Sequence, residues 1–214
     1  MPILDATYAQ GSLGVQMSEI FESGTSLQST VDALSQAMIV WDNDNYQHCV
    51  HTAAYATAIA SELGIDREDA EHVRLGALLH DIGKIGVDLA VVRKPDRLDA
   101  DERETMRQHP DMGASILERV LPRQIVECAA AHHEQPDGGG YPRGLREGEI
   151  PLGALICRVA DVFDSLTTRQ TYRPALSQEQ ALAELREGAG TRYGAGIVAT
   201  IAALCERGAL RPAA

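Results

Sequence analysis

Several histidines in the chain lie directly beside an acidic residue or a second histidine, among them the pairs His80-Asp81 and His132-His133. All seven histidines fall between positions 48 and 133. Neutral imidazole and carboxylate are ligands for zinc, manganese, iron and similar ions, and no thiolate motif competes for that role. Consecutive residues on a helix point about 100° apart, so the members of a pair would hardly chelate one ion side by side. The pairs therefore predict two close ions. Such ions stabilise both the attacking and the leaving oxygen in an in-line displacement at phosphorus.

Other polar residues near these pairs allow more than one explanation. His51 and His72 have no partner pattern, so they are expected to be ordinary surface or core histidines. Asp161 lies in an otherwise apolar stretch, where an unpaired carboxylate would cost several kcal/mol, so it needs a cation or a hydrogen-bond partner. A metal ion would supply one, and a salt bridge to Arg158 would also do. Lys84, in the segment HDIGKIG, is either a solvated lysine or a group that stabilises phosphate charge.

A glycine-rich segment follows the second histidine pair, with the sequence Asp137-Gly138-Gly139-Gly140-Tyr141-Pro142. Three consecutive glycines maximise the entropy that is lost when a loop becomes ordered, and a plain turn would need fewer. Glycine permits close approach of the backbone, and successive N–H groups can form a concavity that binds an anion. Tyr141 adds a hydroxyl group and a ring. Without the neighbouring histidines a surface turn would be the simpler interpretation.

Helices are the elements that must position these residues. Hydrophobic residues recur at a spacing near 3.6, and no convincing alternating run with a hairpin turn is present, so the sequence predicts an all-α domain. Capping residues, glycines and prolines mark the helix ends. The expected helices lie at about 27–41, 45–63, 67–80, 99–109, 110 onward, 123–134, 151–163, 177 onward and 197–204. Residues 1–24 are expected to form a loosely ordered arm, which is too small for a sensory domain. A single domain is expected at residues 25–214.

Composition limits the class of protein. The chain has 214 residues, 44% hydrophobic and 23% charged, which is typical of a folded globular domain. A net charge of −12 repels nucleic acid polymers and anionic membranes, and the few aromatic residues are a poor basis for a platform that stacks bases. No segment predicts a targeting signal or a membrane span. The four cysteines form no C-x-x-C pair, which predicts reduced, mostly buried thiols in the cytoplasm.

Taken in order, the motifs HDIGKIG, HHEQPDGGGYPRGL, EIPLGALICRVADVFDSLTT and TYRPAL resemble the HD-GYP family of metal-dependent phosphohydrolases. The resemblance covers about residues 44–200, most of the chain. It implies an HD-domain-like helical bundle with a glycine-rich GYP loop, and a bacterial role in breaking down cyclic di-GMP to linear pGpG or to GMP. Family members typically use iron or manganese, in keeping with histidine and carboxylate ligands.

The resemblance also implies which residues hold the ions. The implied ligands are His48, His80, Asp81, His109, His132, His133 and Asp161. Asp81 is the ligand that bridges two ions. Asp44 lies four residues before His48, on the same helix face, where some members have a glutamate that holds a third ion. The resemblance therefore implies two ions and leaves a third open.

Substrate contacts follow from the same resemblance. Lys84 matches the family's phosphate-contacting lysine and Arg173 a basic residue near the substrate phosphates, while Gly140, Tyr141 and Pro142 belong to the loop that shapes the entrance. The expected reaction is attack of a metal-bridging hydroxide on one phosphodiester phosphorus, in line with the leaving sugar oxygen, without a covalent enzyme intermediate. The bridging aspartate and Lys84 are the expected catalytic residues, with Lys84 helping to neutralise the phosphate oxygens.

One departure from the family concerns the substrate. Gln170 stands where the family usually has an arginine. A neutral amide lacks the positive charge and the paired N–H donors with which arginine binds a phosphate. Three functions therefore stay open: a cyclic di-GMP phosphodiesterase, a weakly active or non-catalytic metal-bearing module that binds cyclic dinucleotides or a protein partner, and an HD hydrolase of another phosphoester. The apolar stripe of residues 27–41 packs either on its own core or on a second copy, which leaves a homodimer open.

Overall fold

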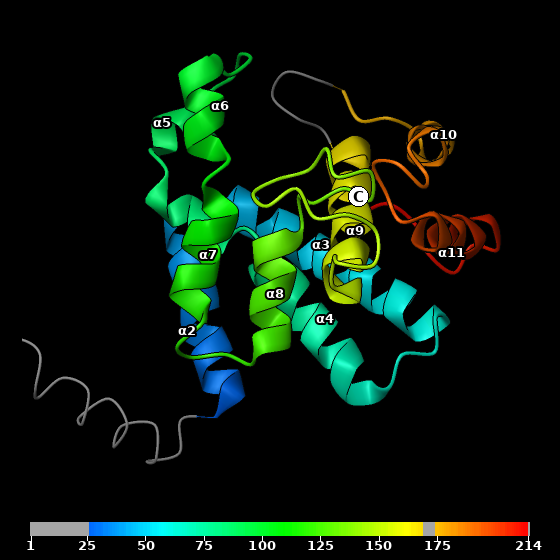
Figure 1. Ribbon diagram of the computed structural model, residues 1–214, viewed down its shortest axis with the longest axis horizontal. Coiled ribbons are helices and arrows are strands. Elements are labelled where there is room, and N and C mark those ends of the chain that lie inside the picture. Colours follow the sequence, from blue (N-terminus) through cyan, green and yellow to red (C-terminus); the bar gives the residue numbers. More distant parts are fainter. Residues whose placement is uncertain (1–25, 169–173, 214) are drawn as a thin grey trace, which may run out of the picture.

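The computed structural model describes residues 26–168 and 174–213, and every regular element in these ranges is a helix (Figure 1). The chain runs through α2 (Leu27–Trp41), α3 (Asn43–Glu62), α4 (Arg67–Leu79), the 3-10 helix η1 (Ile82–Gly86), α5 (Leu89–Val92), α6 (Ala100–Met106), α7 (His109–Leu117), α8 (Arg123–Ala131), α9 (Leu152–Thr167), α10 (Gln178–Glu187) and α11 (Ala195–Glu206). The predicted all-α class is confirmed. The expected arm, residues 1–24, lies outside the described residues.

Capping side chains begin several of these helices where the sequence predicts. Ser26 and Asp66 accept hydrogen bonds from backbone N–H groups in the first turns of α2 and α4. Asp99 and Glu102 form a reciprocal capping box at the start of α6, and Ser177 begins α10 in the same way. Each cap satisfies N–H groups that have no partner inside the helix. The local sequence therefore determines where these helices start.

Three helices end three or four residues away from the prediction, and two of these ends lie at candidate ligands. The third is α9, which was expected to end at about residue 163 and continues to Thr167. The helix expected to reach about His109 ends at Met106, and α7 begins at His109. The helix expected to reach about residue 134 ends at Ala131, with His132 as its C-cap. The first helix gives way to a turn at residues 107–108, directly before His109, and the second gives way to a turn at His132. The short elements η1 and α5 were not predicted, because so few residues carry too little periodicity to detect.

The centre of the bundle consists of α3, α4, α8 and α9, which pack against one another. Their facing sides bury large apolar side chains such as Ile59, Leu79, Ile125 and Phe163 completely. α2 lies against α3, and its Val31 and Met38 belong to the same core, so its apolar stripe packs on the chain's own domain. α10 and α11 lie against α9, whereas α5 and α6 project from one end of the bundle (Figure 1).

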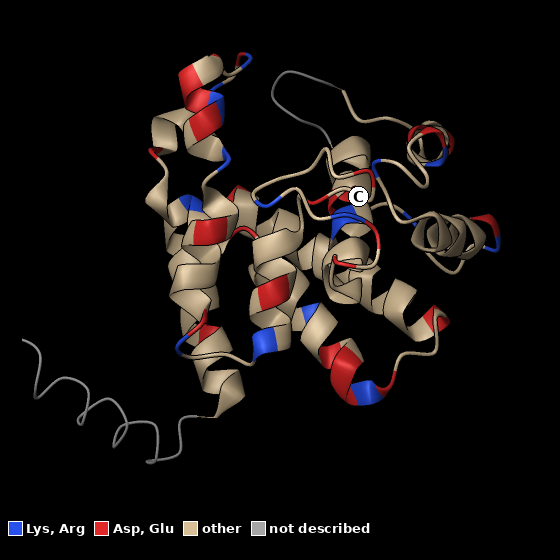
Figure 2. Ribbon diagram, viewed as in Figure 1, with Lys and Arg blue, Asp and Glu red and all other residues tan. Residues whose placement is uncertain are grey.

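The cysteines, the hydropathy of the helices and the distribution of charge can be compared with what the composition predicts. All four cysteines are free and buried. None of the described helices is both long and apolar enough to cross a membrane. In the view of Figure 2 the basic residues lie scattered among the acidic ones, rather than in one stripe, over the described part of a chain whose net charge is −12.

Gly83 in η1 packs directly on the start of α7. A Cβ added at this position would lie 1.9 Å from the carbonyl oxygen of His109 and 2.4 Å from the backbone nitrogen of Gly113. Because these are backbone atoms, Gly83→Ala should lower the free energy of unfolding by about 2 kcal/mol or more. Gly196→Ala is the matched control: nothing lies within 4 Å of its added Cβ, on an exposed turn of α11. That control should be neutral or slightly stabilising. Urea unfolding of the metal-free variants checks both, and equal midpoints would contradict the packing described.

Candidate metal centre

Most of the predicted ligands stand at helix ends. His80 is the C-cap of α4, and Asp81 follows it as the N-cap of η1. His109 begins α7, and His132 is the C-cap of α8. His133 follows directly. His48 and Asp161 instead come from the interiors of α3 and α9. Packing of these helices against one another brings residues that are distant in sequence to one place.

Three of the histidines make the same hydrogen bond. Nδ1 of His80, His109 and His132 lies 2.7 Å from the backbone carbonyl oxygen of the residue three positions earlier. A carbonyl oxygen can only accept, so Nδ1–H donates, and in the neutral ring the lone pair is on Nε2. This is the tautomer in which histidine presents Nε2 to a metal ion.

The Nε2 atoms of His109 and His132 lie only 3.1 Å apart. Burial lowers the pKa of His109 to about 4, and burial together with neighbouring histidines lowers the pKa of His132 well below its usual value. Both rings are therefore neutral at pH 7, so two lone pairs face each other with no proton between them. A metal ion would convert this repulsion into ligation, which means that the donor set fits a cation.

Asp81 belongs to one of two groups of possible ligands and lies close to the other. The groups are His109, His132 and His133, and His48, His80 and Asp81, with the ligand atoms of each group within 4.8 Å of one another. Oδ1 of Asp81 lies 3.3 Å from Nε2 of His109, and Oδ2 lies 3.4 Å from Nε2 of His80. Although burial opposes ionisation, electrostatic interactions with its neighbours, His80 and Lys84 foremost, hold the pKa of Asp81 well below its usual range. One ionised carboxylate thus offers an oxygen to each group, as a bridging ligand must.

His48 is held by two carboxylates of α9. Its Nδ1 lies 2.7 Å from Oδ2 of Asp164, and its Nε2 lies 3.1 Å from Oδ1 of Asp161. Although burial opposes the charge, these hydrogen bonds raise the pKa of His48 to about 10. Sequence reasoning missed Asp164, for which the only signal was its spacing of three residues from Asp161 on one helix. His51 also approaches Asp164, with Nδ1 at 3.2 Å from Oδ1 but without hydrogen-bond geometry, and belongs to neither ligand group.

Asp161 has a hydrogen-bond partner, His48, and a cationic neighbour, Arg158. Besides His48, it lies near Arg158, whose guanidinium nitrogen is 3.7 Å from Oδ2. The same nitrogen lies 3.2 Å from Nδ1 of His133. Arginine can only donate, so this contact places the proton of a neutral His133 on Nε2. His133 must give up the hydrogen bond to Arg158 before Nε2 can bind an ion.

Lys84 and Asp44 have different positions relative to this centre. Nζ of Lys84 donates to Oδ2 of Asp81 at 2.5 Å and to Oδ1 of Asn45 at 3.2 Å. Although burial opposes the charge, Asp81 raises the pKa of Lys84, so the lysine is a charged partner of the centre. Asp44 is exposed in the first turn of α3, its N–H donates to the side chain of Asp42, and it belongs to neither ligand group.

The glycine-rich loop is anchored by Glu134, a buried carboxylate that sequence reasoning missed. Its two oxygens accept hydrogen bonds from the backbone N–H groups of Arg143 and Leu145, at 2.8 and 2.9 Å. Gly140 packs so tightly that an added Cβ would lie 2.4 Å from the backbone nitrogen of Gln135. Gly140 therefore allows two backbone segments to approach closely, and Glu134 holds the end of the loop at Arg143 and Leu145.

Three of the four N–H groups of residues 138–141 are already used within the loop, so they are not free to bind an anion. Those of Gly138, Gly139 and Tyr141 already donate to acceptors in residues 133–137. The contribution of the loop to the centre is instead the ring of Tyr141, which stacks on His133 with centroids 4.6 Å apart and planes 19° apart. Of the expected substrate contacts, Pro142 follows a cis peptide bond after Tyr141, whereas Arg173 lies outside the described residues. Gln170, the departure from the family, lies outside them as well.

Comparisons with known proteins agree with this geometry. A family model described as HD domain matches residues 26–197. The chain belongs to the HD domain family. It is 37% identical over 160 residues to a cyclic di-GMP phosphodiesterase of Thermotoga maritima, an alignment that covers 73% of this chain and 44% of that protein. It is 40% identical over 145 residues to 3'3'-cGAMP-specific phosphodiesterase 3 of Vibrio cholerae, covering 67% of this chain and 32% of that protein.

A solved structure shows the same fold. An HDG"Y"P protein from Bdellovibrio bacteriovorus superposes with a TM-score of 0.65 at 21% identity, covering 88% of this chain and 67% of that one. This structure confirms the predicted HD-type fold, while the family model and the curated relatives confirm the family resemblance. This HD domain spans less than half the length of the two curated relatives.

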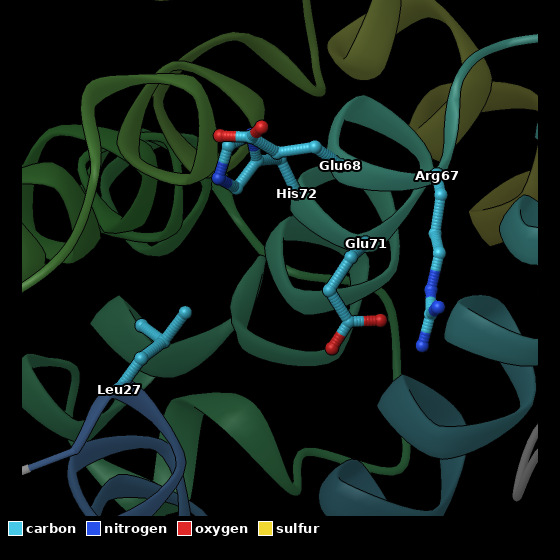
Figure 3. Close-up of a pocket in the computed structure, with 5 residues that line it drawn as sticks. All are labelled: Leu27, Arg67, Glu68, Glu71 and His72. Carbon is cyan, nitrogen blue, oxygen red and sulfur yellow. The ribbon is translucent and has the colours of Figure 1, made fainter.

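A separate surface hollow of the HD domain lies between α2 and α4 (Figure 3). It has a volume of about 430 Å³ and is lined by Leu27, Arg67, Glu68, Glu71 and His72. None of these residues belongs to either ligand group. Nδ1 of His72 lies 3.8 Å from a carboxylate oxygen of Asp69. The expectation that His72 is not a metal ligand agrees with this position.

His48 and His51 provide a matched pair of substitutions in the HD domain. Both lie on α3 and approach Asp164, but only His48 belongs to a ligand group. His48→Gln should lower the metal content by about one ion per chain, whereas His51→Gln should retain the metal content of the wild type. Elemental analysis after dialysis measures this. Equal metal content in the two variants would remove His48 from the ligand set.

The pH dependence of metal binding follows from the protonation states. His48, with a pKa of about 10, must lose a proton before it binds an ion, whereas His109, with a pKa of about 4, is already neutral. Affinity for Mn²⁺ at the His48 group should therefore rise about tenfold per pH unit between about pH 6.5 and 8.5, because the ion competes with one proton. Titrations at several pH values measure this slope. An affinity independent of pH would show that His48 does not bind the ion.

Proposed function

We propose that this HD domain is a metal-dependent phosphodiesterase that hydrolyses cyclic di-GMP to linear pGpG, to GMP, or to both. The observation that supports this most is the position of Asp81, whose two oxygens lie 3.3 and 3.4 Å from imidazole nitrogens of two different ligand groups. Two close ions are the arrangement suited to displacement at phosphorus.

The proposed ligands come from α3, α9 and the helix ends already described. They are His48, His80, Asp81, His109, His132, His133 and Asp161. Their imidazole and carboxylate donors suit iron or manganese, and we propose one of these metals. Two such ions would supply Lewis acidity and a hydroxide nucleophile near neutral pH. Asp44 is exposed and outside both groups, so the proposal is for two ions, with no role assigned to Asp44.

Other residues of the chain would bind and orient the reacting phosphate. Lys84 carries its charge beside Asp81, where Nζ can donate to a non-bridging phosphate oxygen and stabilise the charge that develops there. Tyr141 stacks on His133 and limits the rotation of that ring. Glu134 holds the glycine-rich loop, and with it Gly140, Tyr141 and Pro142, beside His133. These positions support the expected substrate contacts of the loop.

Two cyclic dinucleotides are candidate substrates. The Thermotoga maritima relative favours cyclic di-GMP, whereas the 40% identity to a 3'3'-cGAMP-specific phosphodiesterase favours a hybrid cyclic dinucleotide as the second candidate. Competition between the two compounds in one assay distinguishes them. Such substrates are small molecules of the cytoplasm, and the free, buried cysteines support that reducing location.

Removal of the bridging carboxylate tests the proposal. Asp81→Asn keeps the side-chain shape but removes the charge shared by both groups, so hydrolysis of cyclic di-GMP by the manganese- or iron-loaded protein should fall at least about 1,000-fold. Asp111→Asn, at an exposed position on α7, is the matched control and should retain full activity. Product formation is measured by chromatography. Full metal content and full hydrolysis in Asp81→Asn would refute the mechanism, and an inactive metal-loaded wild type would favour a non-catalytic module.

A further inference from the structure

Arg107 is a cation at the edge of the metal centre to which the sequence assigned no role. It is the C-cap of α6, and its backbone N–H donates to the carbonyl oxygen of Arg103 at 3.0 Å. The carbonyl oxygen of the preceding residue, Met106, accepts the Nδ1–H of His109. The turn that carries Arg107 is therefore tied to a candidate ligand on one side and to α6 on the other.

The guanidinium group of Arg107 contacts an aromatic ring instead of an acid. Its central carbon lies 5.1 Å from the centroid of Tyr141, the loop residue stacked on His133. No carboxylate among residues 26–168 and 174–213 lies within ion-pair distance of it, whereas Arg74 and Arg93 each pair with one. A cation–π contact positions a guanidinium while leaving its N–H donors free for an anion. In a chain with a net charge of −12, this exposed, unpaired cation lies beside the centre that the proposed function requires.

The ring of Tyr141 separates Arg107 from the candidate ligands. The centroid of Tyr141 is 4.6 Å from that of His133 and 5.1 Å from the guanidinium carbon. A phosphate group held beside Asp81 already has Lys84 as its cationic partner. Arg107 is exposed at the outer edge, so the anion within its reach is a different one. A cyclic dinucleotide carries two phosphodiester groups in one ring, and when one reacts the other must lie further out.

We infer that Arg107 binds the second, non-reacting phosphate of the cyclic dinucleotide. This inference rests on the proposed function. Arg107 is then a substrate-binding residue that acts equally in the ground state and the transition state. Its loss should raise KM and leave kcat nearly unchanged. A substrate with a single phosphate should be insensitive to it.

The experiment compares two substrates and two variants. Arg107→Gln and the control Arg119→Gln, an exposed position at the end of α7, remove the same charge from the full chain. Each metal-loaded protein is assayed with cyclic di-GMP and with bis(4-nitrophenyl) phosphate, a diester with one phosphate. Arg107→Gln should raise KM for cyclic di-GMP about tenfold, change kcat less than about twofold, and leave kcat/KM for the aryl diester unchanged. Arg119→Gln should match the wild type on both.

Every other outcome overturns the inference in a recognisable way. Equal KM values in the two variants would show that Arg107 does not touch the substrate. A parallel loss on both substrates would show that Arg107 acts through Tyr141 and the metal centre. Hydrolysis of the aryl diester but not of cyclic di-GMP by the wild type would refute the inference while leaving a metal-dependent phosphodiesterase. Hydrolysis of neither substrate would refute the proposed function itself, and the inference with it.

Discussion

The constraint on which this structure depends is electrostatic. Buried, neutral imidazole rings point their Nε2 lone pairs at one another, with His109 and His132 only 3.1 Å apart, and an ionised Asp81 belongs to one ligand group and lies close to the other. Such a set of donors is unfavourable in a low-dielectric interior unless a cation joins it. The free energy of ion binding is therefore coupled to the packing of the helices that carry these residues.

Helix ends are the means by which the fold meets this constraint. A helix terminus leaves backbone carbonyl groups without intrahelical partners, and the rings of His80, His109 and His132 use carbonyls of this kind as acceptors for Nδ1–H. The same hydrogen bonds select the tautomer and orient the ring. Gly83 allows η1 to approach α7 closely enough for His109 to face Asp81. Fold and ligand chemistry are thus specified by the same few residues.

Sequence reasoning predicted the fold because it depends on local patterns, and such patterns also pointed to the six candidate ligands that the structure brings together in two groups. Capping residues such as Ser26 and Asp66 act within one turn of a helix, and the histidine pairs are visible as neighbours in the chain. Asp164 and Glu134 were missed, because each acts on atoms that the sequence does not identify as its partners: the ring of His48 and the backbone beyond the glycines. The role of the loop was also incompletely predicted, since the N–H groups of Gly138, Gly139 and Tyr141 donate within the loop and the ring of Tyr141 stacks on His133.

The most direct test of the central claim is the electron paramagnetic resonance spectrum of the manganese-loaded protein. Two Mn²⁺ ions that share one carboxylate are magnetically coupled, and the account predicts the spectrum of such a coupled pair for the wild type. Asp81→Asn should abolish the coupling. A spectrum of isolated ions only in the wild type, or a coupled spectrum that survives in Asp81→Asn, would contradict the claim that one aspartate joins two cation sites.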